Sequence, residues 1–523
     1  MKELLHYFNL NKMNNILDII FSFLLNPKSF KYFSIIFLLY NFIGNIILYS
    51  VGGVDYWEHL AAMHSYSLDL VNPSNPYLLS DEPTHLHTPY HLFWGFISKL
   101  LGIHVFFLYP LIAAVNSLLF LIAVKFFARN IINDERYSLP FALTMLVFWI
   151  YPWGYSGVYN LSLLPLTITY PYWFAFPSSI IVISFYGHHL NVKMLFVQYI
   201  IDLFYIFLVG VIFISHPLSA AFLVLCLFTK TLFLKHINSK NIIKLFLIPT
   251  CGLFLSILWP YFPVLDAILE SKQYAAKGFA DTWELFYKYS LIRISPSLLG
   301  VFFIYYKFSK NKIDFLSITI SILILLYTLN YIFFHNVVIS RLIIYIAFFG
   351  HIGIVLALKY FESKNNFNKV RRIFIVITLI LLLPQLILSI FRLGPTKDFI
   401  EKKPLGTFLN IKVFNEYSQL NKFISGNDVV MAPLRESWIL PGIVGCKVVG
   451  VLHSNPFMQD YYERISDTKD FFNEKTNDNY KSKILKKYFV KFIVVPKEFF
   501  SVISKLKFKE LLKTQDFVLL DVN

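Results

Sequence analysis

Residues 52–64 read Gly52-Gly-Val-Asp-Tyr-Trp-Glu-His-Leu-Ala-Ala-Met-His64 and open a polar segment, 51–103, between the first two long apolar runs of the chain. The segment continues through Asn72-Pro-Ser-Asn-Pro-Tyr77 and ends with Thr88-Pro-Tyr-His-Leu-Phe-Trp and Leu100-Leu-Gly102. It is rich in acids and histidines, and Lys99 is its first basic residue apart from His. A loop of this kind between apolar runs is typical of an outer connection in a membrane protein.

The apolar runs on either side extend over most of the 523 residues, of which 57% are hydrophobic and only 15% charged. This composition excludes a disordered chain and a single soluble globule. A helix needs about 20 mostly apolar residues to cross the hydrocarbon core. On this measure we predict eleven transmembrane helices, at 31–50, 104–127, 139–152, 173–188, 195–214, 217–234, 242–262, 296–308, 313–334, 341–359 and 372–392.

The distribution of basic residues predicts the orientation of these helices. Lys and Arg concentrate in alternate connections, whereas residues 153–172 contain none. Because cytoplasmic loops carry the excess of Lys and Arg, we place the N-terminus inside and the C-terminus outside the cytoplasmic membrane. The same rule accounts for most of the net charge of +16, so we expect the lipid bilayer and no nucleic acid as a partner.

We expect the chain to divide into three regions. Residues 1–30 contain a short amphipathic stretch and predict an interfacial segment on the cytoplasmic side. Residues 31–394 form the transmembrane domain. Residues 395–523 alternate strand-length apolar runs with helix-like stretches, which predicts a small extracytoplasmic α/β domain. Its expected strands are 429–431, 447–452, 491–495 and 517–520, and its expected helices are 412–424, 460–473, 481–488 and 498–512.

The candidate reactive group of the first loop consists of Asp55, Glu58 and His59. Their spacing of i, i+3 and i+4 puts them on one face of a helix over 56–68. A carboxylate here can act as a general base, and the three side chains together could hold a divalent cation such as Mg or Mn. The alternative is structural, with Asp55 capping the helix and Glu58 completing the cap.

The overall layout resembles the GT-C superfamily of integral-membrane glycosyltransferases. In that superfamily the catalytic acid lies early in the first external loop, and a juxtamembrane helix with a Pro-aromatic start and a Leu-Gly-type end follows. Asp55 matches the acid, and Thr88-Pro-Tyr-His-Leu-Phe-Trp with Leu100-Leu-Gly102 matches the helix. The adjacent Asp-Glu pair and the Trp-Trp-Asp signature of particular branches are absent, so the resemblance implies the superfamily and not a branch.

The resemblance implies a polyprenyl-phosphate sugar donor, whose phosphate needs a cation near the outer surface. Arg341 in Ile339-Ser-Arg-Leu-Ile343 is the first candidate and Arg293 the second, because a guanidinium can bond two phosphate oxygens. Each could instead be an interfacial or loop charge. Further candidate donor or sugar contacts are His216, Tyr90, His91 and His335. For His216, which precedes Pro217, a plain helix start is the alternative.

The expected function is therefore the transfer of a sugar from a lipid-linked donor to an acceptor at the outer face of the membrane. The alternative is a transporter, flippase or glycan polymerase for envelope saccharides, in which Asp202 within the fifth apolar run would serve a proton or substrate path. A helix–helix contact explains Asp202 equally well. We see no paired Gly/Pro-broken repeats of the kind that transporters show.

Overall fold

The computed structural model describes residues 10–48, 54–80, 82–150, 157–191, 194–234, 239–266, 280–311, 314–362, 364, 367–393, 410–451, 457–503 and 508–522. The chain forms two compact units. Unit 1 contains residues 1–44, 111–258 and 275–394, and unit 2 contains residues 45–110, 259–274 and 395–523. The polar loop 51–103 and the C-terminal region therefore belong to the same unit.

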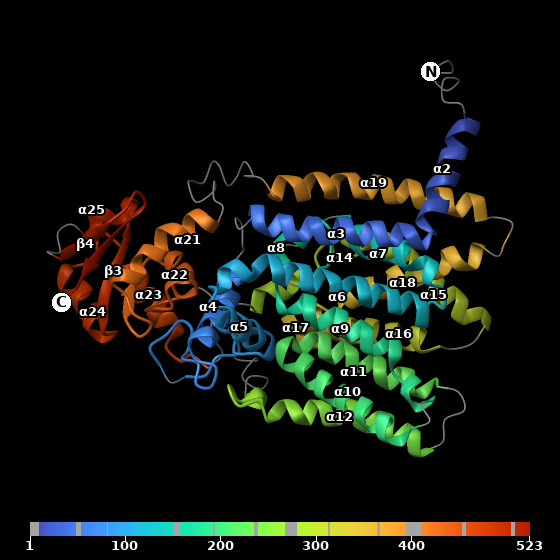
Figure 1. Cartoon of the computed structure of the whole chain (residues 1–523), viewed down its shortest axis with the longest axis horizontal. Coiled ribbons are helices and arrows are strands. Elements are labelled where there is room, and N and C mark those ends of the chain that lie inside the picture. Colours follow the sequence, from blue (N-terminus) through green and yellow to red (C-terminus); the bar gives the residue numbers. More distant parts are fainter. Residues whose placement is uncertain are drawn as a thin grey trace. The chain divides into compact units, whose positions relative to one another are not determined.

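In unit 1 all the regular secondary structure of the described residues is helical (Figure 1). Its longer helices are α2 (Leu10–Leu24), α3 (Pro27–Leu48), α6 (Tyr109–Asn130), α7 (Ser138–Val147), α9 (Pro171–Phe185), α10 (Leu195–Ser215), α11 (Pro217–Leu232), α12 (Ser239–Ile257), α15 (Ser295–Asn311), α16 (Phe315–Leu329), α18 (Ile343–Glu362) and α19 (Phe367–Leu393). Short helical turns connect them: α8 (Leu164–Thr167), η5 (Ala280–Phe286), α14 (Ser290–Arg293), η6 (Asn330–Phe334) and α17 (Val337–Ser340).

Each of the eleven predicted apolar runs overlaps one of these helices. By length and composition, five helices in the described part can cross a membrane, or six if the bent pair Trp283–Arg293 and Ser295–Lys310 forms one span. Three shorter apolar helices accompany them: Pro171–Phe185, Pro217–Leu232 and Asn241–Ile257. The chain is thus an integral membrane protein, while the count of eleven spans and their orientation stay predictions.

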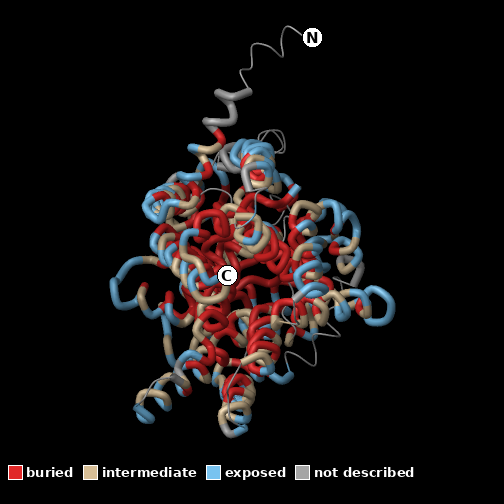
Figure 2. The backbone as a smooth tube through the Cα atoms, turned by 90° about the vertical axis from the view of Figure 1, so that its right-hand side faces the viewer, coloured by how far each residue is buried: buried red, intermediate tan, exposed pale blue. Residues whose placement is uncertain are grey.

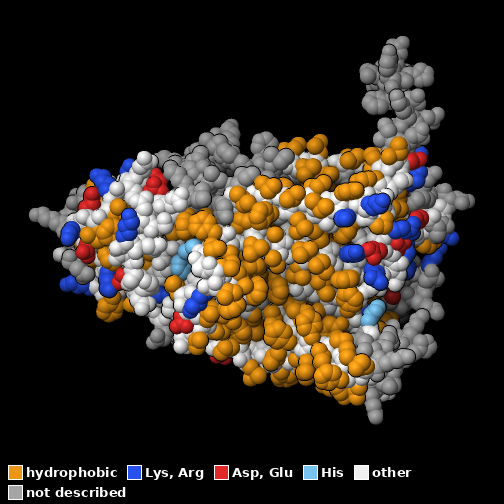
Figure 3. All heavy atoms as spheres, viewed as in Figure 1, with side chains coloured by type: hydrophobic (Ala, Val, Ile, Leu, Met, Phe, Trp, Pro, Cys, Tyr) orange, Lys and Arg blue, Asp and Glu red, His pale blue; other side chains and the backbone are white. Residues whose placement is uncertain are grey.

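The surface and the interior of unit 1 fit a lipid environment. Figure 3 shows hydrophobic side chains over most of the visible face of the helices, with Lys and Arg at one end. Figure 2 shows buried residues in the interior and exposed ones on the peripheral turns. Helices α15 and α18 approach closely through Gly300, Gly350 and Gly353, because a Cβ atom on Gly300 would run into the backbone at Gly350. Small residues permit this kind of packing between membrane helices.

Two polar groups inside the bundle have structural partners. The carboxylate Oδ2 of Asp202 on α10 lies 2.5 Å from Nζ of Lys244 on α12. The Nδ1 atom of His351 on α18 lies 3.2 Å from the hydroxyl of Tyr159. The ion pair supports the interpretation of Asp202 as a contact between two helices.

The C-terminal part of unit 2 contains a five-stranded mixed sheet in the order β2-β1-β3-β5-β4. Strands β1 (Val429–Met431), β2 (Lys447–Val448) and β3 (Val490–Pro496) are parallel, whereas β5 (Phe517–Asp521) runs antiparallel to both β3 and β4 (Lys509–Lys513). The helices around it are α21 (Asn410–Ser418), η7 (Gln419–Lys422), α22 (Glu436–Val444), α23 (Tyr461–Phe471), α24 (Asp478–Lys487), η8 (Lys497–Phe499) and α25 (Phe500–Ile503).

One helix prediction in this region is wrong. Residues 498–512 were expected to be helical, but among the described residues of this stretch only those of η8 and α25 are helical, and β4 begins at Lys509. The sequence Lys-Glu-Leu-Leu-Lys favours a helix locally, and pairing with β5 at the edge of the sheet overrides that preference. Strand β2 is also shorter than the expected 447–452, where residue 452 lies outside the described part.

The polar loop 51–103 contributes two helices to unit 2, α4 (Val54–Leu68) and α5 (Pro89–Leu101). Helix α5 has the expected boundaries. The Thr88 side chain accepts a hydrogen bond from the backbone N–H of His91, and Pro89 occupies the first helical position. At the other end Gly102 takes the left-handed conformation (φ 62°), which ends the helix.

Candidate active site

Helix α4 carries the three reactive candidates of the first loop. Asp55 lies in its first turn and is half-buried, while Glu58, one turn later, is only 3% exposed. A buried carboxylate must be hydrogen-bonded, since its desolvation is otherwise costly. The helix includes Asp55 itself, so the described structure has Asp55 inside the first turn and not at an N-cap preceding residue 56.

A hydrogen-bond donor for Glu58 comes from the C-terminal region. The indole Nε1 of Trp438 on α22 donates to Oε1 of Glu58 over 3.2 Å. Helix α22 can approach α4 closely because it has Gly442 at the contact, where a Cβ atom would lie 3.1 Å from Cδ2 of Leu60. The backbone carbonyl of Gly442 also lies 3.0 Å from Nδ1 of His64. One helix of the tail therefore fixes the helix that carries Asp55.

His59 and His91 form the second contact of this site. Nδ1 of His59 lies 2.9 Å from Nε2 of His91, whose Nδ1 lies 2.8 Å from the Thr88 hydroxyl. Burial lowers the pKa of His91 well below its ordinary value, and the neighbouring His59 contributes. His91 is therefore neutral, and Tyr90 packs edge-on against it with ring centroids 5.6 Å apart. This arrangement orients His59 beside Asp55.

The expected cation site is not formed by these side chains. Among the residues that the structure describes, no three His, Cys, Asp or Glu side chains lie close enough to hold a metal ion. Trp438 bonds Glu58 and His91 contacts His59, so two of the three expected ligands are engaged with protein groups. The donor set does not fit a metal, and no step below uses one.

The segment before α5 is held to the edge strand of the C-terminal sheet. The backbone N–H of Val448 donates to the carbonyl of Tyr77 over 2.7 Å. The ammonium of Lys447 donates to Oγ of Ser74 over 2.7 Å and to the carbonyl of Asn75. Burial lowers the pKa of Lys447 to about 8. These bonds fix the backbone of Tyr77 against the sheet.

The candidate phosphate-binding arginines lie in unit 1. Arg341 follows α17 and is half-buried, with its guanidinium carbon 5.5 Å from the centroid of the Phe286 ring on η5. Arg293 ends α14, is also half-buried, and accepts a hydrogen bond from Ile150 N–H at its carbonyl. His335 is exposed and takes the left-handed conformation (φ 51°), and its ring contacts that of Trp283 in a tilted arrangement with 4.4 Å between the centroids.

His216 is linked to the helix that follows Arg341. It caps α11, because its Nδ1 accepts from the backbone N–H of Ser219, as the structural alternative predicted. The same Nδ1 lies 2.9 Å from the Ser219 hydroxyl, which in turn lies 3.0 Å from the hydroxyl of Tyr345. Tyr345 is four residues after Arg341, and its ring stacks on Phe222. His216 is therefore connected to the helix that follows Arg341 through the hydroxyl groups of Ser219 and Tyr345.

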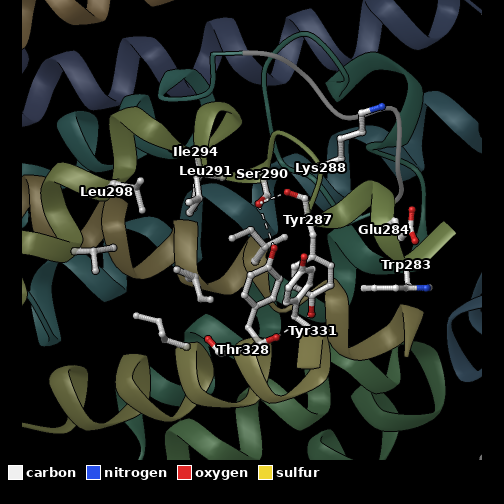
Figure 4. Close-up of a pocket in the computed structure, with 15 residues that line it drawn as sticks. Trp283, Glu284, Tyr287, Lys288, Ser290, Leu291, Ile294, Leu298, Thr328 and Tyr331 are labelled. Atoms are coloured by element: carbon white, nitrogen blue, oxygen red, sulfur yellow. Dashed lines mark hydrogen bonds between the residues drawn. The ribbon is translucent and has the colours of Figure 1, made fainter. Parts of the chain in front are cut away.

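A pocket of about 740 Å³ lies beside this segment, between η5, α14, α15, α16 and α18 (Figure 4). Trp283, Glu284, Lys288 and Tyr331 lie at one end of it, and Leu298 lies at the other. Tyr327 donates to the hydroxyl of Ser290 over 3.2 Å in the wall of the pocket. The pocket thus combines a polar and aromatic end with an apolar interior, and the same turn η5 supplies Phe286 to Arg341.

Sequence reasoning missed Trp438, Gly442, Tyr77 and the pocket. Trp438 follows a Glu-Ser pair in a stretch without a recognisable motif, and its link to Glu58 crosses 380 positions. The structure brings Asp55, Glu58, His59, Tyr90 and His91 together in unit 2, and it places Arg341, Arg293, His216 and His335 in unit 1. The aromatic residues at 283–289 could have indicated the pocket, but the neighbouring apolar runs gave the stronger signal.

Comparison with known proteins identifies the fold. No family profile and no curated protein matches this sequence. Among solved structures, the chain is similar to the Archaeoglobus fulgidus oligosaccharyltransferase in complex with Zn and sulfate, with a TM-score of 0.53 and 12% identity over 90% of this chain and 68% of that chain. It is also similar to ArnT from Cupriavidus metallidurans in the apo state, with a TM-score of 0.52 and 10% identity over 94% of this chain and 98% of that one. These matches confirm the resemblance to GT-C glycosyltransferases as a shared fold.

Proposed function

From the fold shared with GT-C glycosyltransferases, we propose that this protein transfers a sugar from a polyprenyl-phosphate donor to an acceptor at the outer face of the cytoplasmic membrane. The observation that carries the proposal is the position of Asp55. In a chain with this fold, Asp55 lies in the first turn of the helix that follows the first long apolar helix. Eleven spans, with the N-terminus inside and the C-terminal domain outside, complete the proposal.

In the proposed reaction Asp55 is the general base. Its carboxylate takes the proton from the acceptor group as the acceptor atom attacks the anomeric carbon of the donor sugar. The new bond forms at that carbon, the bond to the carrier oxygen breaks, and the phosphate leaves with the electron pair. Glu58, held by Trp438, and His59, held by His91, fix the helix face around Asp55. Fixed neighbours of this kind supply the orientation that such a displacement requires.

The donor is proposed to bind in unit 1. Arg341 would bond the carrier phosphate, with Arg293 as the second cation and His216 and His335 as further contacts. The apolar interior of the pocket suits an isoprenoid chain, and its polar end with Lys288 suits the headgroup region. Phe286 packs against the Arg341 guanidinium, which restricts its rotation and favours bidentate bonding of phosphate.

The competing transport function receives no support from the described residues. Its candidate proton carrier, Asp202, is paired with Lys244. We therefore keep the transfer reaction as the conclusion.

The test compares cells that lack the protein with cells that carry the wild type, Asp55→Asn or Asp69→Asn. Asp69 is another acid of the first loop, and its Oδ1 caps the N–H groups of Val71 and Asn72, a bond that Asn retains. Mass spectrometry of surface glycans and lipid extracts should show one missing glycan residue and an accumulated carrier-linked sugar in the null strain and with Asp55→Asn. Asp69→Asn should restore both. Restoration by Asp55→Asn at equal protein level would refute the proposed base.

A further inference from the structure

The ring of His91 is held at both of its nitrogens, and this decides which nitrogen carries its proton. Its Nδ1 lies 2.8 Å from the Thr88 hydroxyl, and its Nε2 lies 2.9 Å from Nδ1 of His59. The ring also donates to the carbonyl of Leu86, which accepts from the N–H of Thr88 over 2.8 Å and so lies at the Nδ1 end. Because a carbonyl can only accept, we assign the proton of the neutral His91 ring to Nδ1.

This assignment fixes the tautomer of His59. Nε2 of His91 then presents a lone pair, so Nδ1 of His59 is the donor of the bond between them. The two rings meet edge to edge, because their planes are inclined by only 24° and their centroids, 5.0 Å apart, are farther from each other than the two nitrogens. A neutral His59 consequently has its proton on Nδ1 and its lone pair on Nε2.

His59 shares the accessible face of α4 with Asp55. Between positions 55 and 66 these two residues are half-buried, and every other residue is buried. They are four positions apart in one helix, a spacing that puts the Cβ atoms of two side chains roughly 5–6 Å from each other. An acid four positions before a base is also the favourable order on a helix. The accessible part of α4 thus presents one carboxylate and one imidazole, side by side.

The ionisable groups around His59 come from α4, from α5 and from the segment before α5. They are Asp55, Glu58, His91, His87 and His85. Burial lowers the pKa of His91 well below its ordinary value and that of His87 to about 3. These two rings therefore stay neutral near neutral pH. Of the two imidazoles that bond each other, His59 is the one that can take up a proton.

Resting on the proposed transfer reaction, we propose that Nε2 of His59 receives the proton that Asp55 takes from the acceptor, and that His91 is the positioning residue that holds His59 in the required tautomer. His59 acts through Asp55 and is a positioning residue in the same sense. An imidazole suits this task, because proton transfer is most efficient when the base titrates near the working pH.

The proton follows one path through the two side chains. The O–H or N–H bond of the acceptor breaks as its heavy atom bonds the anomeric carbon, and the carrier phosphate leaves with the electron pair of the broken bond. The proton passes to a carboxylate oxygen of Asp55 and then to Nε2 of His59. Asp55 is again a carboxylate, and His59 is an imidazolium whose Nδ1–H stays bonded to His91. Water removes the proton from His59 before the next turnover.

The first measurement needs no substrate. The full-length protein, labelled with nitrogen-15 histidine in lipid nanodiscs at neutral pH, reports the protonated nitrogen of each ring through its nitrogen shifts. The signal of His59 is the one missing from His59→Gln. We expect the Nδ1–H form of His59 in the wild type and loss of this preference in His91→Phe, which removes the acceptor. An Nε2–H form in the wild type would overturn the proposal.

The second measurement is transfer as a function of pH. Membranes of the null strain supply the accumulated carrier-linked sugar and the unmodified acceptor, and mass spectrometry follows the product that added protein forms. His59→Gln should be at least about tenfold slower at neutral pH. Its activity should decline at a lower pH than that of the wild type, since carboxyl groups titrate below imidazoles. His91→Phe should be slowed as well, and the double variant should be no slower than His59→Gln.

The matched control is His188→Gln. His188 is an exposed histidine of unit 1, in the turn His188–Asn191. This variant should keep the rate and the pH profile of the wild type, and equal melting temperatures will show that each variant is folded. If His91→Phe melts early, the wild-type tautomer and His59→Gln decide the question.

The outcomes separate this proposal from the transfer reaction. A wild-type pH profile in His59→Gln would overturn the path through His59 and leave the transfer reaction in place. Additive losses in the double variant would overturn the role of His91. A wild-type protein that forms no product at any pH would overturn the transfer reaction, and this proposal with it.

Discussion

The indole Nε1 of Trp438 donates a hydrogen bond to the carboxylate of Glu58, across 380 positions of the chain. Glu58 is almost fully buried one turn after Asp55, so this bond helps to satisfy a carboxylate that has lost most of its contact with water. The C-terminal region is thus part of the structure around the proposed base.

Trp438→Phe should keep the ring and remove the donor. A hydrogen bond to a charged group contributes about 1.5–3 kcal/mol, so we expect roughly a tenfold or greater loss of sugar transfer. Trp259→Phe is the control, because its Nε1 donates to the neutral carbonyl of His87 over 2.7 Å. Transfer assays in nanodiscs should show reduced sugar transfer for Trp438→Phe and wild-type transfer for Trp259→Phe. Equal activities would show that Glu58 does not depend on Trp438.

Arg341→Gln should lower the catalytic efficiency with the carrier-linked donor. Loss of a charge-assisted bond to phosphate predicts a roughly tenfold to hundredfold fall in kcat/KM for the carrier-linked sugar, with a smaller fall for Arg341→Lys because an ammonium cannot bond two oxygens in a fork. Arg136→Gln is the control, since Arg136 pairs with Asp134 and Glu362. An Arg341→Gln variant with unchanged donor kinetics would assign the phosphate to another cation, with Arg293 as the next to test.

Gly442→Val should separate α22 from α4. The first added carbon would lie 3.1 Å from Leu60, and overpacking of this kind costs about 1–3 kcal/mol. We expect a lower melting temperature and reduced transfer. Gly426→Val serves for comparison, because its Cβ atom would meet nothing closer than the Gly445 carbonyl at 3.7 Å. If both variants melt alike, the contact between the two helices is not tight.

Glu436 should make the stability of the protein depend on pH. Burial raises the pKa of this carboxyl to about 7, so the folded state binds a proton more tightly than the unfolded state does. The stabilisation is complete below the ordinary pKa of the carboxyl and is lost as the pH rises to about 7, by at most about 3 kcal/mol.

Glu436→Gln should therefore flatten the dependence of the melting temperature on pH over this range and raise the melting temperature at pH 8. The exposed Glu474 provides the control substitution Glu474→Gln, which should leave the pH dependence of the wild type in place. A wild-type melting temperature that rises with pH through this range would contradict the prediction.

Much of the fold was accessible from the sequence because its signals are local. The apolar runs predicted helices at every one of the eleven places, since the hydrophobic pattern of a membrane helix needs no distant partner. The boundaries of α5 were legible in Thr88, Pro89 and Gly102, which act within one turn. The strands 429–431 and 517–520 were also found from their composition.

The errors and omissions fall where distant residues meet. Strand β4 was predicted as a helix because its residues favour a helix locally. In the structure they pair with β5 instead. The spacing on α4 suggested a possible metal site, but the described residues contain no group of three His, Cys, Asp or Glu side chains that could hold an ion, and Trp438 and His91 engage Glu58 and His59. Spacing along a helix shows which side chains share a face, but it does not show what packs against that face.

The sequence by itself determined a helical membrane protein with a C-terminal α/β region and an acid, Asp55, at the start of the polar loop 51–103. Only the tertiary structure decided that Trp438 binds Glu58 and that Lys447 and Val448 hold the segment of Tyr77. The physical reason is that these contacts join residues hundreds of positions apart. Their free energy depends on burial and geometry that exist only once the loop and the tail have folded into one unit.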